Sequence, residues 1–175
     1  MELAILDWIQ EIFRSPIMDT IMKFITSLGY EGYLYYLMII ALLIPKKTRK
    51  VGLILGIAIL FNWILANLTL KPLVARVRPY NVNTAIDIII HKPSSYSFPS
   101  GHTAQAFTAA FAFLFAKSKL TKPMFILAIL IGFSRLYFYV HYPTDVLGGV
   151  LTGCLSAYLA YITIKSIEKK MVKSH

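Results

Sequence analysis

Five apolar stretches dominate the sequence and constrain its fold more than any other feature. Each is close in length to a helix that crosses a bilayer, which takes roughly 20 residues and fewer where the bilayer thins. They cover approximately residues 30–45, 51–70, 99–117, 123–140 and 144–165. Because 57% of the residues are hydrophobic, the chain carries more apolar surface than a water-soluble domain of this size can bury. The sequence predicts an all-α integral membrane protein, a helical bundle of about five transmembrane helices.

The first 28 residues do not resemble a membrane span. Apolar residues recur every three to four positions, with polar and charged residues between them, a pattern typical of an amphipathic helix. Ser15 and Pro16 indicate the N-cap and first position of a second short helix. These helices can lie in the bilayer interface or pack on the protein's own bundle. We predict one domain with an amphipathic interfacial segment at 1–28 and a transmembrane part at 29–175.

The distribution of cationic residues predicts the orientation in the membrane. If five spans alternate between two faces, eleven of the 18 Lys and Arg residues fall on one face and seven on the other. Because positive residues favour the cytoplasmic side, the face with eleven cations is predicted to be cytoplasmic. The net charge of +10 does not indicate a nucleic-acid partner, because these cations lie between apolar spans and not on one basic face.

Three short polar segments lie at the ends of these spans, and all three fall on the face with fewer cations. Ionisable groups are costly at such positions and usually functional. The segments are Lys71-(six residues)-Arg78-Pro79, Pro99-Ser100-Gly101-His102 and Ser134-Arg135-(five residues)-His141-(three residues)-Asp145. Their shared position predicts one site, at the face directed outward, that binds an anion such as phosphate.

The second segment predicts a helix start. If Pro99 occupies the first turn, the amides of Ser100, Gly101 and His102 lack intrahelical acceptors and can bind an anion. Cationic side chains at the other segments suit phosphate oxygens, although each could also snorkel to the membrane interface. These cations are Lys71, Arg78 and Arg135.

The third segment supplies a reactive pair. His141 and Asp145 are four residues apart, and Pro143 indicates that the last helix starts between them. Taken singly, Asp145 could be a helix cap and His141 an interfacial residue. Together they allow the carboxylate to accept a proton from one imidazole nitrogen and leave the other free to attack. His102 is then a second imidazole that can protonate a leaving oxygen.

A metal site is the main alternative for these residues. Beyond residue 31 the only carboxylates are Asp87, Asp145 and Glu168, too few for two-metal phosphatase chemistry. A single zinc ion on His102, His141 and Asp145 is conceivable, but three nearby cations would repel it. We predict no metal and no cofactor.

The three segments resemble the signature of the type 2 phosphatidic acid phosphatase superfamily, which also includes bacterial acid phosphatases and vanadium haloperoxidases. Every element is present with unchanged spacing. Typical membrane members carry six spans; this chain is similar to short bacterial members that act on lipid A or undecaprenyl diphosphate. The resemblance implies a lipid phosphatase domain at 29–175, in the bacterial cytoplasmic (inner) membrane, with its site facing the periplasm or exterior. Its substrate would be a lipid phosphate monoester or diphosphate, such as undecaprenyl diphosphate, lipid A 1-phosphate or phosphatidylglycerophosphate.

The resemblance also implies residue roles and no cofactor. His141 would be the nucleophile that forms a phosphohistidine, and Asp145 would orient it. His102 would protonate the leaving group and later activate water. The phosphate oxygens would be held by Lys71, Arg78, Ser100, the Gly101 amide and Arg135.

Three other functions agree less well with this sequence. A non-catalytic lipid-phosphate-binding or scrambling protein of the same fold should lack His102, His141 or Asp145, and this chain has all three. A transporter would place its ionisable residues near mid-membrane, not at span ends. A haloperoxidase would need vanadate and normally a soluble scaffold.

Overall fold

The computed structural model describes residues 1–173, which form helices and connecting segments. The all-α prediction is confirmed for this range, and the last two residues of the predicted 29–175 unit lie outside it. In chain order the elements are α1 (Glu2–Phe13), α2 (Pro16–Ser27), the 3₁₀ turn η1 (Tyr30–Gly32), α3 (Tyr33–Leu43), α4 (Arg49–Asn62), the π-helix η2 (Trp63–Leu70), α5 (Lys71–Val74), α6 (Pro79–Val82), α7 (Gly101–Phe115), α8 (Thr121–Tyr137) and α9 (Pro143–Lys173).

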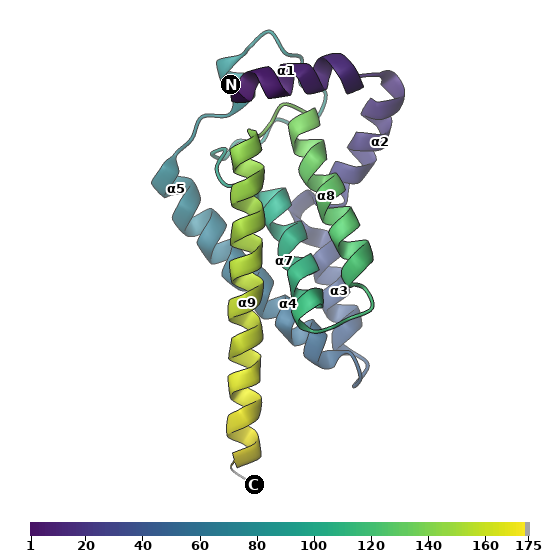
Figure 1. The fold of residues 1–175 in the computed structure, drawn as a ribbon, viewed down its shortest axis with the longest axis vertical. Coiled ribbons are helices and arrows are strands. Elements are labelled where there is room, and N and C mark those ends of the chain that lie inside the picture. Colours follow the sequence, from purple (N-terminus) through teal and green to yellow (C-terminus); the bar gives the residue numbers. More distant parts are fainter. Residues whose placement is uncertain (174–175) are drawn as a thin grey trace.

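The bundle is organised around α7, which packs against α4, α8 and α9. At one end α1 lies across the bundle, and α2 descends beside α8 (Figure 1). The long α9 continues beyond its neighbours at the opposite end, where the C-terminus lies. The bundle therefore has one end covered by α1 and one open end.

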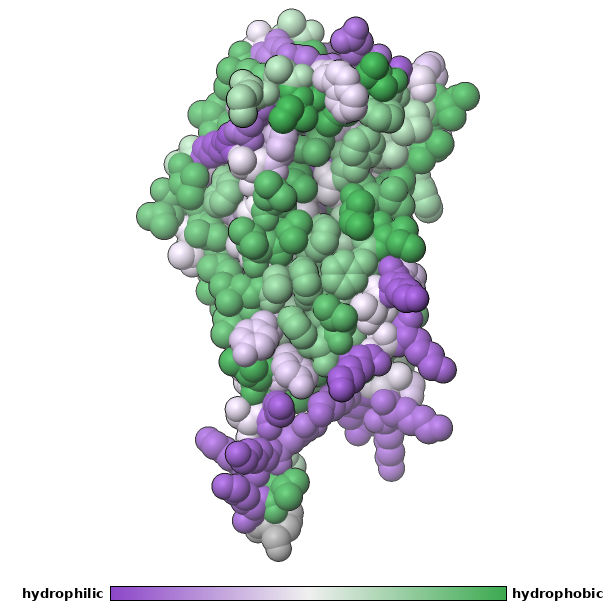
Figure 2. Space-filling view, viewed as in Figure 1, coloured by the Kyte–Doolittle hydropathy of each residue, from purple (hydrophilic) through white to green (hydrophobic). Residues whose placement is uncertain are grey.

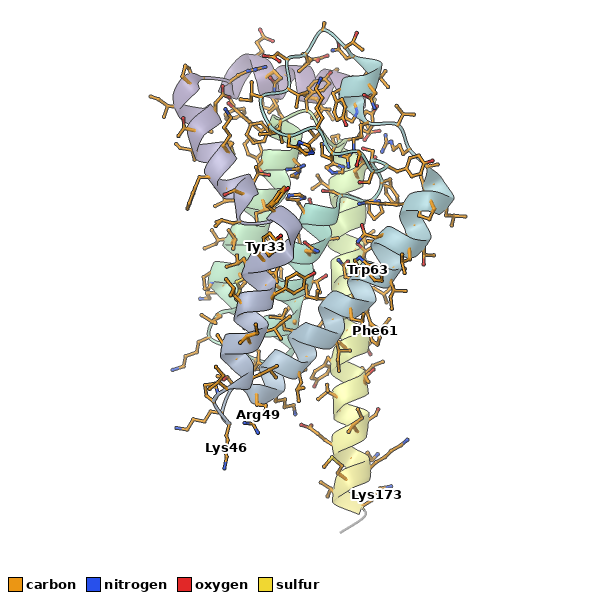
Figure 3. All side chains as sticks on the ribbon, turned by 180° about the vertical axis from the view of Figure 1, so that it is seen from behind. Tyr33, Lys46, Arg49, Phe61, Trp63 and Lys173 are labelled. Carbon is orange, nitrogen blue, oxygen red and sulfur yellow. The ribbon has the colours of Figure 1, made fainter. Side chains whose placement is uncertain are left out.

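The surface has the distribution that the charge pattern predicts. Apolar side chains surround the middle of the bundle, and hydrophilic side chains gather at the lower end (Figure 2). Lys46, Arg49 and Lys173 lie at the end away from α1 (Figure 3). Two helical stretches, Arg49–Val82 and Pro143–Lys173, are long and apolar enough to cross a membrane. The count of five transmembrane helices stays a prediction.

The N-terminal segment forms the two predicted short helices. The Ser15 hydroxyl caps α2 by accepting a hydrogen bond from the Met18 amide at 3.3 Å, and Pro16 occupies the first helical position. This local geometry follows the capping preferences of serine and proline.

Both helices contact the bundle through buried apolar residues, Leu6 and Ile9 on α1 and Met22 and Ile25 on α2, and through polar side chains beside them. Asp7 accepts a hydrogen bond from the Tyr139 hydroxyl at 2.7 Å, and Asp19 accepts one from the Tyr137 hydroxyl at 2.6 Å. The other side exposes large apolar residues, including Ile5, Trp8, Ile12, Ile17 and Phe24. The segment packs on the bundle through apolar and polar contacts, and its exposed apolar residues fit a bilayer interface.

Glycines on α9 let it approach α7 closely. A Cβ atom on Gly149 would lie 2.9 Å from the Ser100 carbonyl oxygen. One on Gly153 would lie 2.8 Å from both the Ala104 carbonyl oxygen and the Thr108 amide nitrogen. Because backbone atoms cannot move aside cheaply, these small residues set the spacing of the helices that carry the second and third segments.

We expect Gly153→Ala to destabilise the protein by about 1–3 kcal/mol, because overpacking forces α7 and α9 apart. Thermal unfolding in detergent measures this as a lower Tm. Gly56→Ala on α4 is a matched control, since its Cβ atom would meet only Ile39, at 3.7 Å. Equal Tm values for the two variants would contradict the proposed close contact.

Candidate active site

The three polar segments meet at the end of the bundle that α1 covers, around a cavity of about 700 Å³. None of the described residues that line the cavity is acidic. Six of the eight predicted site residues line it: Lys71, Arg78, Gly101, His102, Arg135 and His141. The other two, Ser100 and Asp145, are fully buried behind the cavity wall.

Two of the cations are held by neutral groups. Lys71 Nζ donates to Asn67 Oδ1 at 2.8 Å and to Ser95 Oγ at 3.3 Å. Arg78 Nε donates to the Ser95 carbonyl oxygen at 2.7 Å, and its Nη1 donates to the Val140 carbonyl oxygen at 2.8 Å. Since these partners carry no charge, the positive potential remains available to an anion.

Arg135 is 2% exposed and lies at the end of α8. Its Nη1 donates to the Thr26 hydroxyl on α2 at 2.6 Å. Its Nε has no hydrogen-bond partner among the described residues. A buried cation without a counter-charge is costly, so this position fits a residue that contacts a bound anion.

The start of α7 differs from the prediction for Pro99. A cis Phe98–Pro99 bond precedes the helix, which begins at Gly101 with Ser100 as its N-cap. The placement of Pro99 in the first turn is therefore wrong. The turn instead directs the Ser100 amide toward α9, where it donates to the Asp145 carbonyl oxygen at 3.0 Å.

Of the other groups at the start of α7, the Ser100 hydroxyl is buried in packing contacts, whereas Gly101 and His102 line the cavity. Ser100 Oγ lies 2.8 Å from Thr103 Oγ1 and is buried. Gly101 and His102 line the cavity, and their amides precede the first hydrogen bond of the helix, from the Ala104 amide. Unpaired amides at a helix N-terminus favour an anion. The His102 ring packs on Gly29, where a Cβ atom would lie 2.9 Å from it.

The third segment places its imidazole between a cation and a carboxylate. His141 Nδ1 lies 3.4 Å from Asp145 Oδ2, and Nε2 lies 3.1 Å from Arg78 Nη1. A guanidinium group only donates hydrogen bonds, so Nε2 must be the acceptor and the proton must be on Nδ1. The Nε2 lone pair therefore lies on the side of the cationic cavity.

Burial lowers the pKa of His141 from 6.5 to about 3. The main cause is that the buried imidazolium form loses its hydration; Arg78 and Arg135 lower the pKa further, and the hydrogen bond with Asp145 offsets only part of the shift. The imidazole is therefore neutral, as a nucleophile must be.

This shift predicts how stability depends on pH. The unfolded His141 takes up a proton near pH 6.5, whereas the folded one does so only near pH 3. The unfolded state thus binds more protons in this window, and stability falls as pH decreases from 6.5 toward 3. We expect Tm to decrease between about pH 7 and about pH 5, and to decrease less in His141→Gln. Identical slopes in the two proteins would contradict the shift.

Arg76 and Glu2 belong to the site but were not among the predicted residues. Arg76 Nη1 donates to Asp145 Oδ1 at 2.7 Å and to the Thr144 hydroxyl at 2.6 Å. Its Nη2 donates to the Glu2 carboxylate, and its guanidinium carbon lies 3.9 Å from the centre of the Tyr142 ring. Arg76 thus joins α1 to the carboxylate beside His141.

The local chain geometry directs Arg76 inward. Ala75 ends α5 in the left-handed conformation with φ 47°, which is unfavourable for alanine and persists only where the surroundings impose it. The sequence does carry a signal for Arg76, because it is the third cation of the polar segment 71–79. Glu2 had no sequence signal, because it lies 74 residues away from its partner.

Among the described side chains, no three of His, Cys, Asp or Glu are grouped to hold a metal ion. The described site consists of cations, two imidazoles and one buried carboxylate at the ends of apolar helices. This fold and site define a helical membrane phosphatase. The sequence profile of the PAP2 superfamily matches residues 34–168, and the chain belongs to this superfamily.

Similar proteins support the same class. An undecaprenyl-diphosphatase of Sulfolobus acidocaldarius is 33% identical over 144 residues, which cover 82% of this chain and 69% of that protein. The crystal structure of Aquifex aeolicus LpxE matches with a TM-score of 0.79 and 30% identity, over 91% of this chain and 93% of that one. A transmembrane phosphatidylglycerolphosphate phosphatase from Bacillus subtilis matches with a TM-score of 0.73 and 30% identity, over 95% and 84%. The predicted family and enzyme class are confirmed.

Proposed function

We propose that the protein hydrolyses a lipid phosphate monoester or diphosphate through a phosphohistidine intermediate on His141. The observation that carries this proposal is the position of His141, with Nε2 toward Arg78 and the cavity and Nδ1 toward Asp145. The reaction belongs to the unit at 29–175, with the 1–28 segment at the bilayer interface. No metal or other cofactor takes part in the proposed steps.

The geometry supports the following sequence of steps. A phosphate oxygen takes over the Arg78 donor that now points at Nε2, which frees the lone pair to attack phosphorus. His102 protonates the leaving oxygen as the phosphorus–oxygen bond breaks, and later activates the water that releases phosphate. The negative charge that develops on the phosphoryl oxygens is stabilised by fixed donors: Lys71, Arg78, Arg135 and the Gly101 amide.

The cavity also suggests how a lipid enters. Besides polar residues it is lined by Tyr36 of α3 and Trp63 of η2, which are 44% and 47% exposed. Figure 3 shows the start of α3, at Tyr33, and Trp63 on neighbouring helices that diverge toward the site. We propose that the tail passes between α3 and η2 while the head group reaches His141. The basic residues at the opposite end favour a site that faces the periplasm or exterior of a bacterial inner membrane.

The proposal is tested with purified protein in detergent. Release of inorganic phosphate is measured from undecaprenyl diphosphate, lipid A 1-phosphate and phosphatidylglycerophosphate with excess EDTA present. We expect EDTA-resistant release from at least one of them, strongly reduced in Lys71→Met. Lys47→Met, at the α3–α4 turn, is the matched control and should retain activity. Binding of a lipid phosphate without hydrolysis would contradict the proposal and favour the non-catalytic alternative.

We expect Arg76→Gln to lower kcat about 10- to 100-fold, because a hydrogen bond to a charged group contributes about 1.5–3 kcal/mol. The variant removes the cation that holds Asp145 Oδ1. Glu2→Gln should cause a smaller loss, since it only loosens Arg76. Arg14→Gln, directly after α1, is the control, because the Arg14 guanidinium donates to Gln10 and to the Asp87 carbonyl oxygen and not to Asp145. Equal kcat values for the Arg76 and Arg14 variants would exclude this positioning role.

A further inference from the structure

The cavity extends beyond the phosphate-holding residues to Lys23 of α2 and His91 of the long loop. Both side chains are exposed, and both line the same cavity as His141. Neither belongs to the three polar segments, and neither forms a hydrogen bond or ion pair with the described residues. The proposed hydrolysis of a monoester leaves these two residues without a role.

Lys23 lies directly next to the phosphate-holding residues. It precedes Thr26 by three residues on α2, so the two side chains share one face of the helix. Thr26 in turn accepts the hydrogen bond from Arg135 at 2.6 Å. Lys23 is therefore one helical turn away from Thr26, the residue that contacts Arg135, and its side chain is exposed.

His91 reaches the cavity because its loop is anchored at the phosphate-holding residues. Ser95 of this loop accepts hydrogen bonds from Lys71 and Arg78. The Pro93 carbonyl oxygen accepts one from the Tyr80 hydroxyl at 2.7 Å. The loop thus holds the exposed His91 in the lining of the same cavity as Lys23.

Charge decides which ligand suits this arrangement. In the proposed reaction Lys71, Arg78 and Arg135 hold one phosphate, and none of the described residues that line the cavity is acidic and could balance a fourth cation. A lipid diphosphate carries a second charged phosphate next to the first, between the reacting group and the tail. We propose that Lys23 and His91 form a second subsite that binds the proximal phosphate of a lipid diphosphate. This inference rests on the proposed function and names its substrate class.

The chemistry balances with no further reactant than water. His141 Nε2 forms a bond to the distal phosphorus, and the bond between that phosphorus and the bridging oxygen breaks. The electron pair stays on the bridging oxygen, which leaves as part of a lipid monophosphate whose charge Lys23 compensates. Water then cleaves the phosphohistidine to inorganic phosphate. A phosphate is a better leaving group than an alkoxide. Cleavage of the diphosphate therefore depends less on protonation by His102 than cleavage of the monophosphate does.

The test compares two substrates with the same tail, farnesyl diphosphate and farnesyl monophosphate, in detergent. For Lys23→Met we expect kcat/KM to fall about tenfold on the diphosphate, which corresponds to about 1.4 kcal/mol. On the monophosphate, kcat/KM should fall by no more than about twofold. His91→Ala should likewise lower kcat/KM more on the diphosphate than on the monophosphate. The matched control is Lys92→Met, since Lys92 does not line the cavity and its ammonium lies 5.9 Å from the Tyr80 ring.

The outcomes separate this inference from the function on which it rests. A larger loss on the diphosphate in Lys23→Met, absent in Lys92→Met, supports the second subsite. Equal losses on both substrates overturn it and leave the phosphatase proposal intact. If the unmodified protein releases no phosphate from either of these or from the three natural lipids, the proposed function itself fails.

Discussion

Replacement of His141 by Ala is expected to reduce kcat by about 10⁴-fold or more. Without the covalent nucleophile, Asp145 and His102 have no group to orient and no intermediate to hydrolyse. The side chain is 2% exposed, and its Nε2 is the imidazole nitrogen that faces Arg78 and the cavity. Another group cannot easily replace it, since the other imidazole, His102, lies at the start of α7. Single-turnover release of phosphate from a labelled lipid measures this effect without interference from product release.

The covalent step gives a second readout. If His102 activates water, His102→Asn should accumulate an acid-labile, phosphate-labelled protein, whereas His141→Ala should carry no label. His91→Ala is the histidine control and should still form the labelled intermediate, because the contact proposed for His91 is with the second phosphate and not with the reacting one. A His141→Ala protein that becomes labelled, or that retains more than about 1% of kcat, would assign the nucleophile elsewhere.

Features that depend on neighbouring residues could be predicted from the sequence. The Ser15–Pro16 start of α2 and the Pro143 start of α9 both follow from local capping chemistry. The cationic site was predictable because ionisable residues at span ends are costly and therefore informative. The N-terminal amphipathic pattern was predictable as well, but its periodicity could not decide which surface the polar side would face.

Features that depend on distant contacts could not be predicted. The contact of Glu2 with Arg76 exists only once α1 lies across the bundle end. Pro99 was misplaced because the turn before α7 is set by the hydrogen bond from Ser100 to the Asp145 carbonyl. The π-helical η2 has no sequence signature, yet it carries Asn67, which binds Lys71 at 2.8 Å. In each case a tertiary contact determines the local geometry.

The carboxylate beside His141 explains why Asp145→Asn should be nearly as damaging as loss of the nucleophile. Asp145 is fully buried, and its Oδ2 accepts hydrogen bonds from the Ser97 hydroxyl and, at 2.9 Å, from the Tyr142 amide. Oδ1 accepts from Arg76. Because Tyr142 and Arg76 can only donate here, both carboxyl oxygens are needed as acceptors.

An asparagine at this position must turn an NH₂ group toward one of these donors. If it faces His141, the imidazole must move its proton to Nε2 in order to accept. That proton would then face Arg78, which also only donates, and the lone pair would be lost from the attacking nitrogen. We therefore expect kcat to fall on the order of 10⁴-fold, as when a catalytic histidine is held in the wrong tautomer.

The measurement combines kinetics with the protonation state of the ring. ¹⁵N NMR of labelled histidine should show a proton on Nδ1 of His141 in the unmodified protein and on Nε2 in Asp145→Asn. Ser97→Ala is the matched control, because it removes one donor and keeps the carboxylate, so the tautomer should persist and kcat should fall only about tenfold. If Asp145→Asn kept the proton of His141 on Nδ1 and a kcat within about tenfold of the unmodified protein, the carboxylate would act only in packing. An electrostatic role requires the larger loss.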